Sequence, residues 1–426
     1  MTAARSRLVK GLAALVSGTA GAQAVTLLST PILVRLYGME RWGEFGAFSA
    51  LYLTALTVAA MRFDQAVPVA KSDEEARAVL ALGQLAAAGL ALAVFACSLA
   101  FGPWLAEVTK VAALRDQPWL LPLALLGGGL YVAFSSWHLR RGTFRVVAAT
   151  TFTQSLAMVA VQFTGWFVAP VRAFALPLGL AAGRSAGFLN LWRGYLRDVS
   201  GGTGRSSLRQ AWRGYSRFAF LGVPSSLANA AGLQAPTVLL SALFGTWAAG
   251  QFYTSMRILG LPMVFLGAAV SQVYLAEFGR LLRENPAGLH RFFRGAVRRL
   301  LMVAPLLALM GGTAPWWFPI VFGAEAGKAG VWSLWLTPSL CLGLVCSPVS
   351  STANSLGRQD LQLGMDLLRL ALTVACFAIP GRAWSADARV ALYGAMMAAT
   401  YLAYLLLYDR LVARATGAAA PAGEAA

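Results

Sequence analysis

The sequence predicts an all-α protein that crosses a membrane twelve times, in two six-helix lobes related by an internal repeat. Hydrophobic residues fill 58% of the 426 positions and charged residues only 12%, whereas soluble domains carry about 25% charged residues. Apolar stretches of about 18 to 25 residues, long enough to cross a bilayer as helices, recur along the whole chain. In addition, a segment near residue 40 returns near residue 247.

The apolar stretches place the expected helices near residues 11–34, 46–66, 77–101, 119–138, 146–168, 173–192, 217–243, 250–276, 297–319, 331–352, 361–379 and 389–408. The first expected helix follows Arg5, Arg7 and Lys10 and contains Ala22-Gln23-Ala24. A basic region followed by an apolar run and a small-residue triplet is also the arrangement of a cleavable secretory signal. Apolar character continues beyond this triplet without a polar break. We therefore expect the segment to remain as the first membrane helix.

Basic residues, 35 against 17 acidic ones, indicate the orientation. With the N-terminus inside, 23 of them fall in inner segments, and the outer segments hold Arg35, Arg41, Lys110, Arg115, Arg172, Lys328, Arg382 and Arg389. This bias fits the positive-inside rule, so both termini are expected in the cytoplasm. The inner residues can also contact anionic lipids of the bilayer. Because they are spread over short loops, no nucleic acid partner is expected.

The internal repeat aligns Leu36–Gly46 (LYGMERWGEFG) with Leu243–Tyr253 (LFGTWAAGQFY). The aligned pairs include Gly38 with Gly245, Gly43 with Gly250 and Glu44 with Gln251, and a weaker echo pairs Gly142 with Gly357. Each strong segment joins the first helix of a half to the second. The repeat and a glycine-rich polar stretch predict an N-terminal lobe at 1–200, a cytoplasmic connector at 201–216, a C-terminal lobe at 217–412 and a disordered tail at 413–426.

The sequence shows no cluster of cysteines and histidines that would predict a metal site. The four cysteines, which lie within apolar spans and behave there as small hydrophobes, are Cys97, Cys341, Cys346 and Cys376. His138 and His290 are the only histidines, and neither has the companions that a metal site requires. No metal and no cofactor are expected.

Two segments resemble a transporter family. Arg35–Ala76 (RLYGMERWGEFGAFSALYLTALTVAAMRFDQAVPVAKSDEEA) resembles the first-half signature of Wzx-type polysaccharide flippases, and Leu243–Phe278 resembles the second-half counterpart. These carriers belong to the multidrug/oligosaccharidyl-lipid/polysaccharide exporter (MOP) superfamily. The resemblance implies a MATE-like fold that translocates undecaprenyl-pyrophosphate-linked oligosaccharide units across the bacterial inner membrane by alternating access.

The same resemblance implies a role in surface polysaccharide biosynthesis, such as that of O-antigen. Other polysaccharide assembly proteins are candidate partners, beside the lipid-linked glycan itself. The related lipid II flippases have fourteen helices, whereas twelve are predicted here, which counts against that assignment.

The stretch VAAMRFDQAVPVAKSDEEA, residues 58–76, places two charges beside an apolar span. Ser72 and Glu75 have the spacing of a capping box, which predicts the start of the third helix. Arg62 and Asp64 are two residues apart and cannot pair on one helical face. Two readings stay open for them: Arg62 reaches the interface and Asp64 forms a local ion pair, or both serve transport.

Arginines at graded depth are the main candidates for a substrate site: Arg35, Arg62, Arg184, Arg257 and Arg369. A single mid-membrane arginine costs about 2.5–3.5 kcal/mol on insertion scales, so several in separate helices favour a shared wet cavity. Arginine forks suit the oxygens of a pyrophosphate. Structural readings stay open, because Asp366 can neutralise Arg369 and Arg184 adjoins a stripe of Gly179, Gly183 and Gly187 that permits close helix approach.

Three polar residues in the predicted spans, Gln23, Asn229 and Gln234, are candidates for hydrogen bonds to sugar or to other helices. Asp64, Asp366 and Glu277 are candidate ion-coupling groups. The alternatives to a flippase are a cation-coupled multidrug exporter of the same superfamily and a membrane enzyme, a polymerase or glycosyltransferase, acting on lipid-linked sugars. Enzymes of that kind usually present catalytic groups on an extensive aqueous loop, and the outer loops are short, so we do not expect an enzyme.

Overall fold

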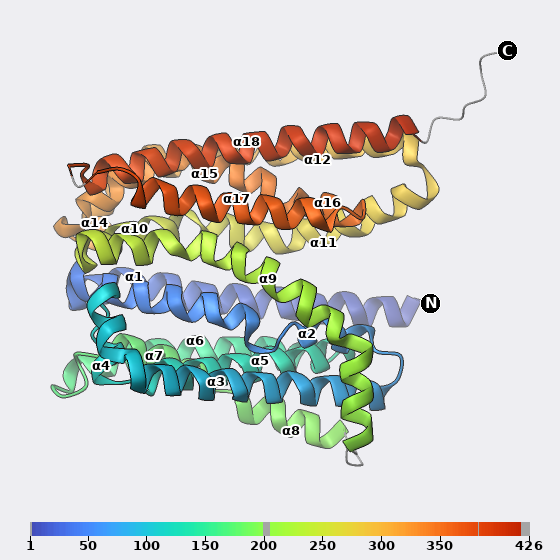
Figure 1. The fold of residues 1–426 in the computed structure, drawn as a ribbon, viewed down its shortest axis with the longest axis horizontal. Helices are drawn as coiled ribbons and strands as arrows, with labels where there is room; N and C mark the ends of the chain where they lie inside the picture. The colour runs from blue at the N-terminus through green and yellow to red at the C-terminus, as the bar shows by residue number, and fades with distance from the viewer. Residues whose placement is uncertain (1, 199–204, 382, 419–426) are drawn as a thin grey trace. The chain divides into compact units, whose positions relative to one another are not determined.

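The described part of the chain is almost entirely helical. The structure, a computed structural model, describes residues 2–198, 205–381 and 383–418, and describes side chains for residues 15–197, 208–220, 222–263, 270–381 and 383–416. Within these ranges it contains no β-strand (Figure 1). The predicted all-α fold class is confirmed. By its internal contacts the chain forms two compact units, Met1–Gly250 and Gln251–Ala426.

The first unit contains α1 (Thr2–Ala59), α2 (Phe63–Ala66), η1 (Val67–Val69), α3 (Asp73–Thr109), α4 (Ala113–Asp116), α5 (Leu120–Arg140), α6 (Phe144–Phe167), α7 (Ala175–Ser185), α8 (Phe188–Asp198) and α9 (Arg205–Phe244). α10 (Thr246–Leu259) begins in this unit and continues into the second. The second unit then contains α11 (Leu261–Glu284), η2 (Pro286–Gly288), α12 (Leu289–Leu301), α13 (Ala304–Gly312), α14 (Ala314–Phe322), η3 (Ala324–Ala326), α15 (Gly327–Val349), α16 (Ser351–Ser355), α17 (Gln359–Ala378) and α18 (Ala386–Ala418).

These helices account for the predicted membrane spans. Among the described residues, seven helices are long and apolar enough to cross a membrane, or nine if each of two bent pairs is one span. α1 covers two predicted spans, because its 58 residues bend at Gly38, where φ is 74°. The pairs α7–α8 and α10–α11 lie on the predicted spans at 173–192 and 250–276. All twelve predicted spans therefore have helical counterparts.

Four spans that were expected to be continuous helices are broken, which corrects the prediction. The chain bends by 46° between α1 and α2 and by 61° between α13 and α14. Gly187 separates α7 from α8 with a φ of 77°. Pro262 and Pro315 each lie in the first turn of the helix after a break, where the missing N–H of proline is tolerated.

The internal repeat is visible in backbone conformation. Gly38 and Gly245 have φ values of 74° and 86°, and Gly142 and Gly357 have values of 70° and 75°. Positive φ carries no steric cost for glycine, so both aligned pairs mark equivalent turns. The repeat prediction is therefore supported by geometry as well as by sequence.

A reciprocal close contact joins the two copies of the repeat within the first unit. A Cβ atom on Gly43 would overlap the carbonyl oxygen of Thr246, and one on Gly250 would overlap the carbonyl oxygen of Met39. Met39 aligns with Thr246 as Gly43 aligns with Gly250, so the contact is the same in both directions. It requires glycine at both positions.

The aligned pair Glu44 and Gln251 makes equivalent hydrogen bonds inside its own unit. The Ala113 N–H donates to Glu44 Oε1 at 3.2 Å, at the start of α4. The Ala329 N–H donates to Gln251 Oε1 at 2.8 Å, in the first turn of α15. Each side chain thus ties the second span of its half to the start of a later helix.

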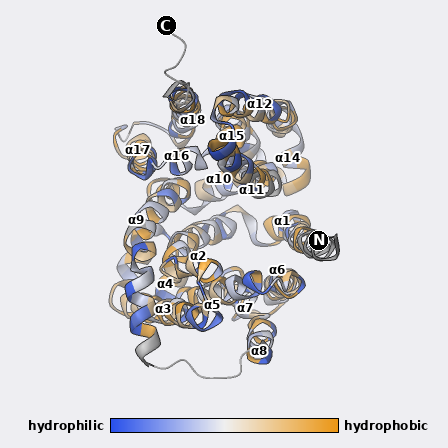
Figure 2. Ribbon diagram, turned by 90° about the vertical axis from the view of Figure 1, so that its right-hand side faces the viewer, coloured by the Kyte–Doolittle hydropathy of each residue, from blue (hydrophilic) through white to orange (hydrophobic). Residues whose placement is uncertain are grey.

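The boundaries of the predicted lobes stay a prediction. Residues 199–204, which include the first part of the predicted connector at 201–216, lie outside the described residues, and α9 begins at Arg205. The N-terminal part of α9 carries Arg209, Arg213 and Arg217, and Figure 2 shows blue, hydrophilic stretches there. α18 continues to Ala418, so residues 413–418 of the predicted tail are helical, and residues 419–426 lie outside the described residues.

Candidate functional site

Arg62 lies in the break between α1 and α2, in an unusual backbone conformation. Met61 and Arg62 have φ values of 45° and 61°, and left-handed conformations of non-glycine residues cost about 1–3 kcal/mol each. Such strain persists only where the surrounding structure imposes it. Here the sequence contains no glycine or proline at residues 58–67 that would explain the break.

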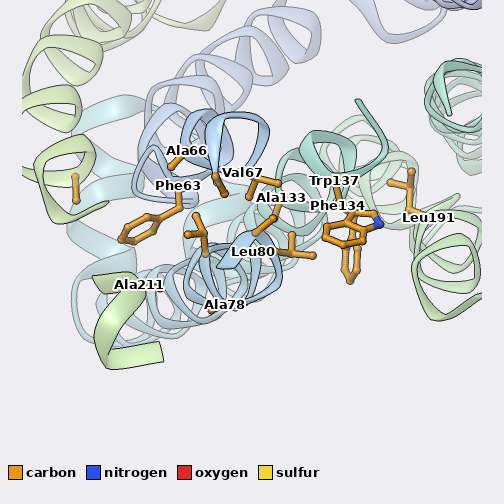
Figure 3. Packing of buried hydrophobic residues seen from close by; sticks show 14 residues of the cluster. Phe63, Ala66, Val67, Ala78, Leu80, Ala133, Phe134, Trp137, Leu191 and Ala211 are labelled. Atoms are coloured by element: carbon orange, nitrogen blue, oxygen red, sulfur yellow. The ribbon is translucent and has the colours of Figure 1, made fainter. Parts of the chain in front are cut away.

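Burial of the next residues explains the break instead. Phe63, Ala66 and Val67 are 1% exposed or less and belong to one hydrophobic cluster with residues of α3, α5, α8 and α9. Figure 3 shows Phe63 and Val67 in this cluster, with the Phe63 ring directed toward α9. A straight continuation of α1 would not present α2 to this cluster, so packing outweighs helix continuity.

The side chain of Arg62 is half-buried against α9. A Cβ atom on Gly222 would lie 3.3 Å from Arg62 Cγ, so glycine leaves room for the arginine stem. Within the described part of the chain, no acceptor hydrogen-bonds the buried Nε of Arg62. Asp64 lies in the first turn of α2 and is also half-buried. A guanidinium and a carboxylate therefore share one helix break.

Arg140 holds the segment that follows the break. Its Nη1 donates to the Ala70 carbonyl at 2.7 Å and to the Val67 and Pro68 carbonyls at 3.3 Å each. Its Nη2 lies 3.2 Å from the Asp73 carboxylate. One side chain from the end of α5 thus binds three carbonyls of the segment between α2 and α3.

The predicted capping box at the start of α3 is present in part. The Glu75 N–H donates to Ser72 Oγ at 3.1 Å, as expected of an N-cap. The Glu75 carboxylate accepts from the Lys71 N–H at 2.8 Å, one residue before the position that a complete box uses.

Arg184 is positioned by the glycine stripe of α7. A Cβ atom on Gly183 would lie 2.6 Å from Met158 Cβ, so α7 and α6 approach closely, as predicted. Gly187 lies in the break after α7 and not on the helical stripe. The Arg184 guanidinium lies 5.5 Å from the centre of the Tyr52 ring, where a cation is attracted to the ring face.

Arg257 and Arg369 have partners on their own helices. Arg257 Nη1 donates to the Tyr253 hydroxyl at 2.8 Å, within α10. Arg369 is 3.5 Å from Asp366 in α17, and the two residues are 9% and 7% exposed. This supports the reading in which Asp366 neutralises Arg369, because a buried arginine is stable only when paired.

The remaining predicted residues differ in exposure. Arg35 and Asn229 are exposed, and Gln23 and Gln234 are half-buried. Glu277 lies past the predicted span 250–276 and pairs with Arg280 at 2.5 Å. This pairing lowers the pKa of the Glu277 carboxyl, which disfavours protonation there. All these site assignments stay predictions.

A polar pocket in the first unit includes residues that were not predicted as a site. Its volume is about 380 Å³, within the range of small-molecule sites. It is lined by Glu40, Arg41, Glu44, Lys110, Ala112, Ala113, Asp116, Gln117, Ala173, Phe174 and Thr246. Its residues come from four separate segments. The sequence signal was limited to charged residues in the repeat segment and in the connection from α3 to α5. Among the described side chains, no three His, Cys, Asp or Glu groups are placed to bind a metal ion.

Comparisons with known proteins identify the fold. No protein family model matches the chain, and no curated protein sequence matches it. Solved structures match over almost its whole length. An inward-facing multidrug resistance MATE family transporter of the MOP superfamily gives a TM-score of 0.71 at 15% identity and covers 93% of this chain and 96% of its own.

Two further structures agree. The lipid II flippase MurJ, in an inward closed conformation, gives a TM-score of 0.70 at 12% identity, covering 94% of this chain and 89% of its own. A mutant MATE transporter of Vibrio cholerae, VcmN, gives 0.64 at 16% identity, covering 96% and 97%. These identities are low, and they show the fold alone. The chain therefore has the multi-pass, all-helical fold that these MATE transporters and MurJ share.

Proposed function

We propose that the protein is a flippase for undecaprenyl-pyrophosphate-linked oligosaccharide units, which it moves across the bacterial inner membrane by alternating access. Both termini are cytoplasmic in this proposal, and the product is used for a surface polysaccharide such as O-antigen. The observation that carries the proposal is the helix break at Arg62. Broken helices line substrate sites in many transporters, and this break holds a guanidinium whose buried Nε has no acceptor within the described chain.

The chemistry of Arg62 favours an anionic substrate. A guanidinium presents planar, forked donors that match phosphate oxygens and form short, charge-assisted hydrogen bonds. Arg184, in the same unit, lies over an aromatic ring rather than against a carboxylate. We propose that Arg62 and Arg184 in the first unit, and Arg257 and Arg369 in the second, bind the pyrophosphate at different stages of transport. Arg35, Gln23, Asn229 and Gln234 are proposed to contact the substrate's polar groups.

A cation-coupled multidrug exporter is the second candidate, favoured by a specific observation. The half-buried Asp64 lies in a helix break, and a carboxylate there can bind a cation or a proton. Two of the matching structures described above are MATE transporters, and one of these two is a multidrug resistance transporter. Asp64 is also our first choice for an ion-coupling group in the flippase, before Asp366, which is paired, and Glu277, which is in an exposed ion pair.

A deletion strain separates these functions. Loss of a flippase leaves lipid-linked oligosaccharide in the inner leaflet, and the wild-type gene restores the normal distribution. Loss of a polymerase leaves single units displayed on the outer leaflet, and loss of a glycosyltransferase shortens the glycan. Normal surface glycan together with increased sensitivity to cationic drugs would reject the flippase and select the multidrug exporter.

A further inference from the structure

The pocket in the first unit is built from segments that are far apart in sequence. Glu40, Arg41 and Glu44 follow the bend of α1 at Gly38. Lys110, Asp116 and Gln117 belong to the connection from α3 to α5, and Phe174 ends the connection from α6 to α7. The topology predicted from the basic residues places all these connections on the outer side of the membrane. The pocket therefore lies at the end of the unit where a transported molecule would leave.

Hydrogen bonds hold the walls of the pocket together. Glu44 Oε1 accepts from the Ala113 N–H, which joins α1 to α4. Arg41 Nη1 donates to the Ala173 carbonyl at 3.3 Å, which joins α1 to the segment before α7. Gln117 Oε1 accepts from Trp119 Nε1 at 2.9 Å, which orients the amide. These bonds fix the Glu44, Arg41 and Gln117 side chains in the walls of the pocket.

The charges of the lining are nearly balanced. Three carboxylates, Glu40, Glu44 and Asp116, face two cations, Arg41 and Lys110. A polyanion such as pyrophosphate would meet the three carboxylates, and a multivalent cation would meet the two basic groups, so like-charge repulsion disfavours both. A neutral ligand rich in hydroxyl groups can donate to the carboxylates and accept from the guanidinium, ammonium and amide groups. The Phe174 ring offers an apolar surface to the C–H face of a sugar.

We propose that this pocket binds the saccharide part of the substrate on the outer side, apart from the arginines that bind its pyrophosphate. The proposal rests on the proposed function, because that function supplies a glycan to be bound. Glu40 is the most useful residue to test: it lines the pocket, it is exposed, and it is not one of the side chains that tie the walls.

The test measures sugar binding without transport. The full chain is purified in nanodiscs and mixed with neutral oligosaccharides released by mild acid from the lipid-linked pool of the host cell. Saturation-transfer NMR and calorimetry report binding. Glu40→Ala and Gln117→Ala are expected to weaken binding roughly three- to tenfold each, as the loss of one hydrogen bond predicts. Glu107→Ala is the matched control, because Glu107 is an exposed helical glutamate near Lys110 that does not line the pocket.

The outcomes are distinct. Equal binding by wild type and both pocket variants would overturn the proposal, as would failure of every neutral oligosaccharide to bind the wild type. Direct binding of tetraphenylphosphonium that Glu40→Ala abolishes, with no binding of sugar, would assign the pocket to cations instead. Sugar binding that is lost in the variants would support the pocket even if the deletion strain showed no trapped lipid-linked glycan, in which case the proposed flippase alone would fail.

Discussion

Substitution of Gly43 by alanine tests the reciprocal contact between the repeat copies. The new Cβ would overlap the Thr246 carbonyl oxygen and lie 2.5 Å from the Gly250 amide nitrogen. Both obstacles are backbone atoms of a helix, so no side-chain rotation relieves them. Overpacking of this kind typically costs about 1–3 kcal/mol, and Gly43→Ala should lower the free energy of unfolding by that amount.

The control is Gly89→Ala in α3, where nothing lies within 4 Å of the new Cβ. Alanine is favoured over glycine in a helix by about 1 kcal/mol, so this variant should be as stable as the wild type or more stable. Both variants are unfolded by titration with SDS in mixed micelles, with tryptophan fluorescence as the signal. Gly250→Ala should behave as Gly43→Ala, and the double variant should be non-additive because both groups meet at one contact. Equal stability of Gly43→Ala and Gly89→Ala would refute the close approach.

Three further predictions concern transport, the loop after the break and topology. Arg62→Ala and Arg257→Ala should abolish surface glycan in a complementation assay while protein remains in the membrane. Lysine at either site should restore it only partly because lysine lacks the fork. The control Arg382→Ala, in a predicted outer segment, should export normally, and normal export by the Arg62→Ala, Arg257→Ala double variant would reject the role of both arginines. Arg140→Ala should lower the free energy of unfolding by about 1–3 kcal/mol because it removes the donor that the Pro68 and Ala70 carbonyls share. Arg140→Lys should lie between Arg140→Ala and the wild type, and an unchanged SDS midpoint would contradict this. A reporter fused to the C-terminus should indicate cytoplasm and one inserted at Gly245 should indicate periplasm, and a periplasmic C-terminus would contradict the two-lobe topology.

The helix count and the repeat could be predicted from the sequence because their signals are local. Span length follows from apolar runs, and the aligned glycines at 38 and 245 have similar positive φ values because both turns need the same backbone. The pairing of Asp366 with Arg369 was likewise foreseen as one reading, since residues three apart on a helix are neighbours. Such features depend on few residues, all close in sequence.

The break at Arg62 could not be predicted, because its cause is distant in sequence. Residues 58–67 contain no helix breaker, and the left-handed backbone is imposed by burial of Phe63 and Val67 against α3 and α5. The pocket was missed for the same reason, since its lining comes from connections more than 200 residues apart. Arg382, the control residue for the transport variants, lies outside the described residues.

The matched hydrogen bonds of Glu44 and Gln251 show how the two copies of the repeat differ at one equivalent position. Both residues accept a backbone N–H, so the architectural task tolerates either an acid or an amide. The amide also donates through Nε2 to the Glu325 carbonyl at 2.6 Å, which a carboxylate could not do. The acid in the first copy adds a negative charge to the pocket lining there, while the second copy uses a neutral group for the same task. Glutamate and glutamine have nearly the same shape, so both can accept the same backbone hydrogen bond and preserve the shared scaffold. The change from an amide to a carboxylate is nevertheless enough to make one half chemically different from the other.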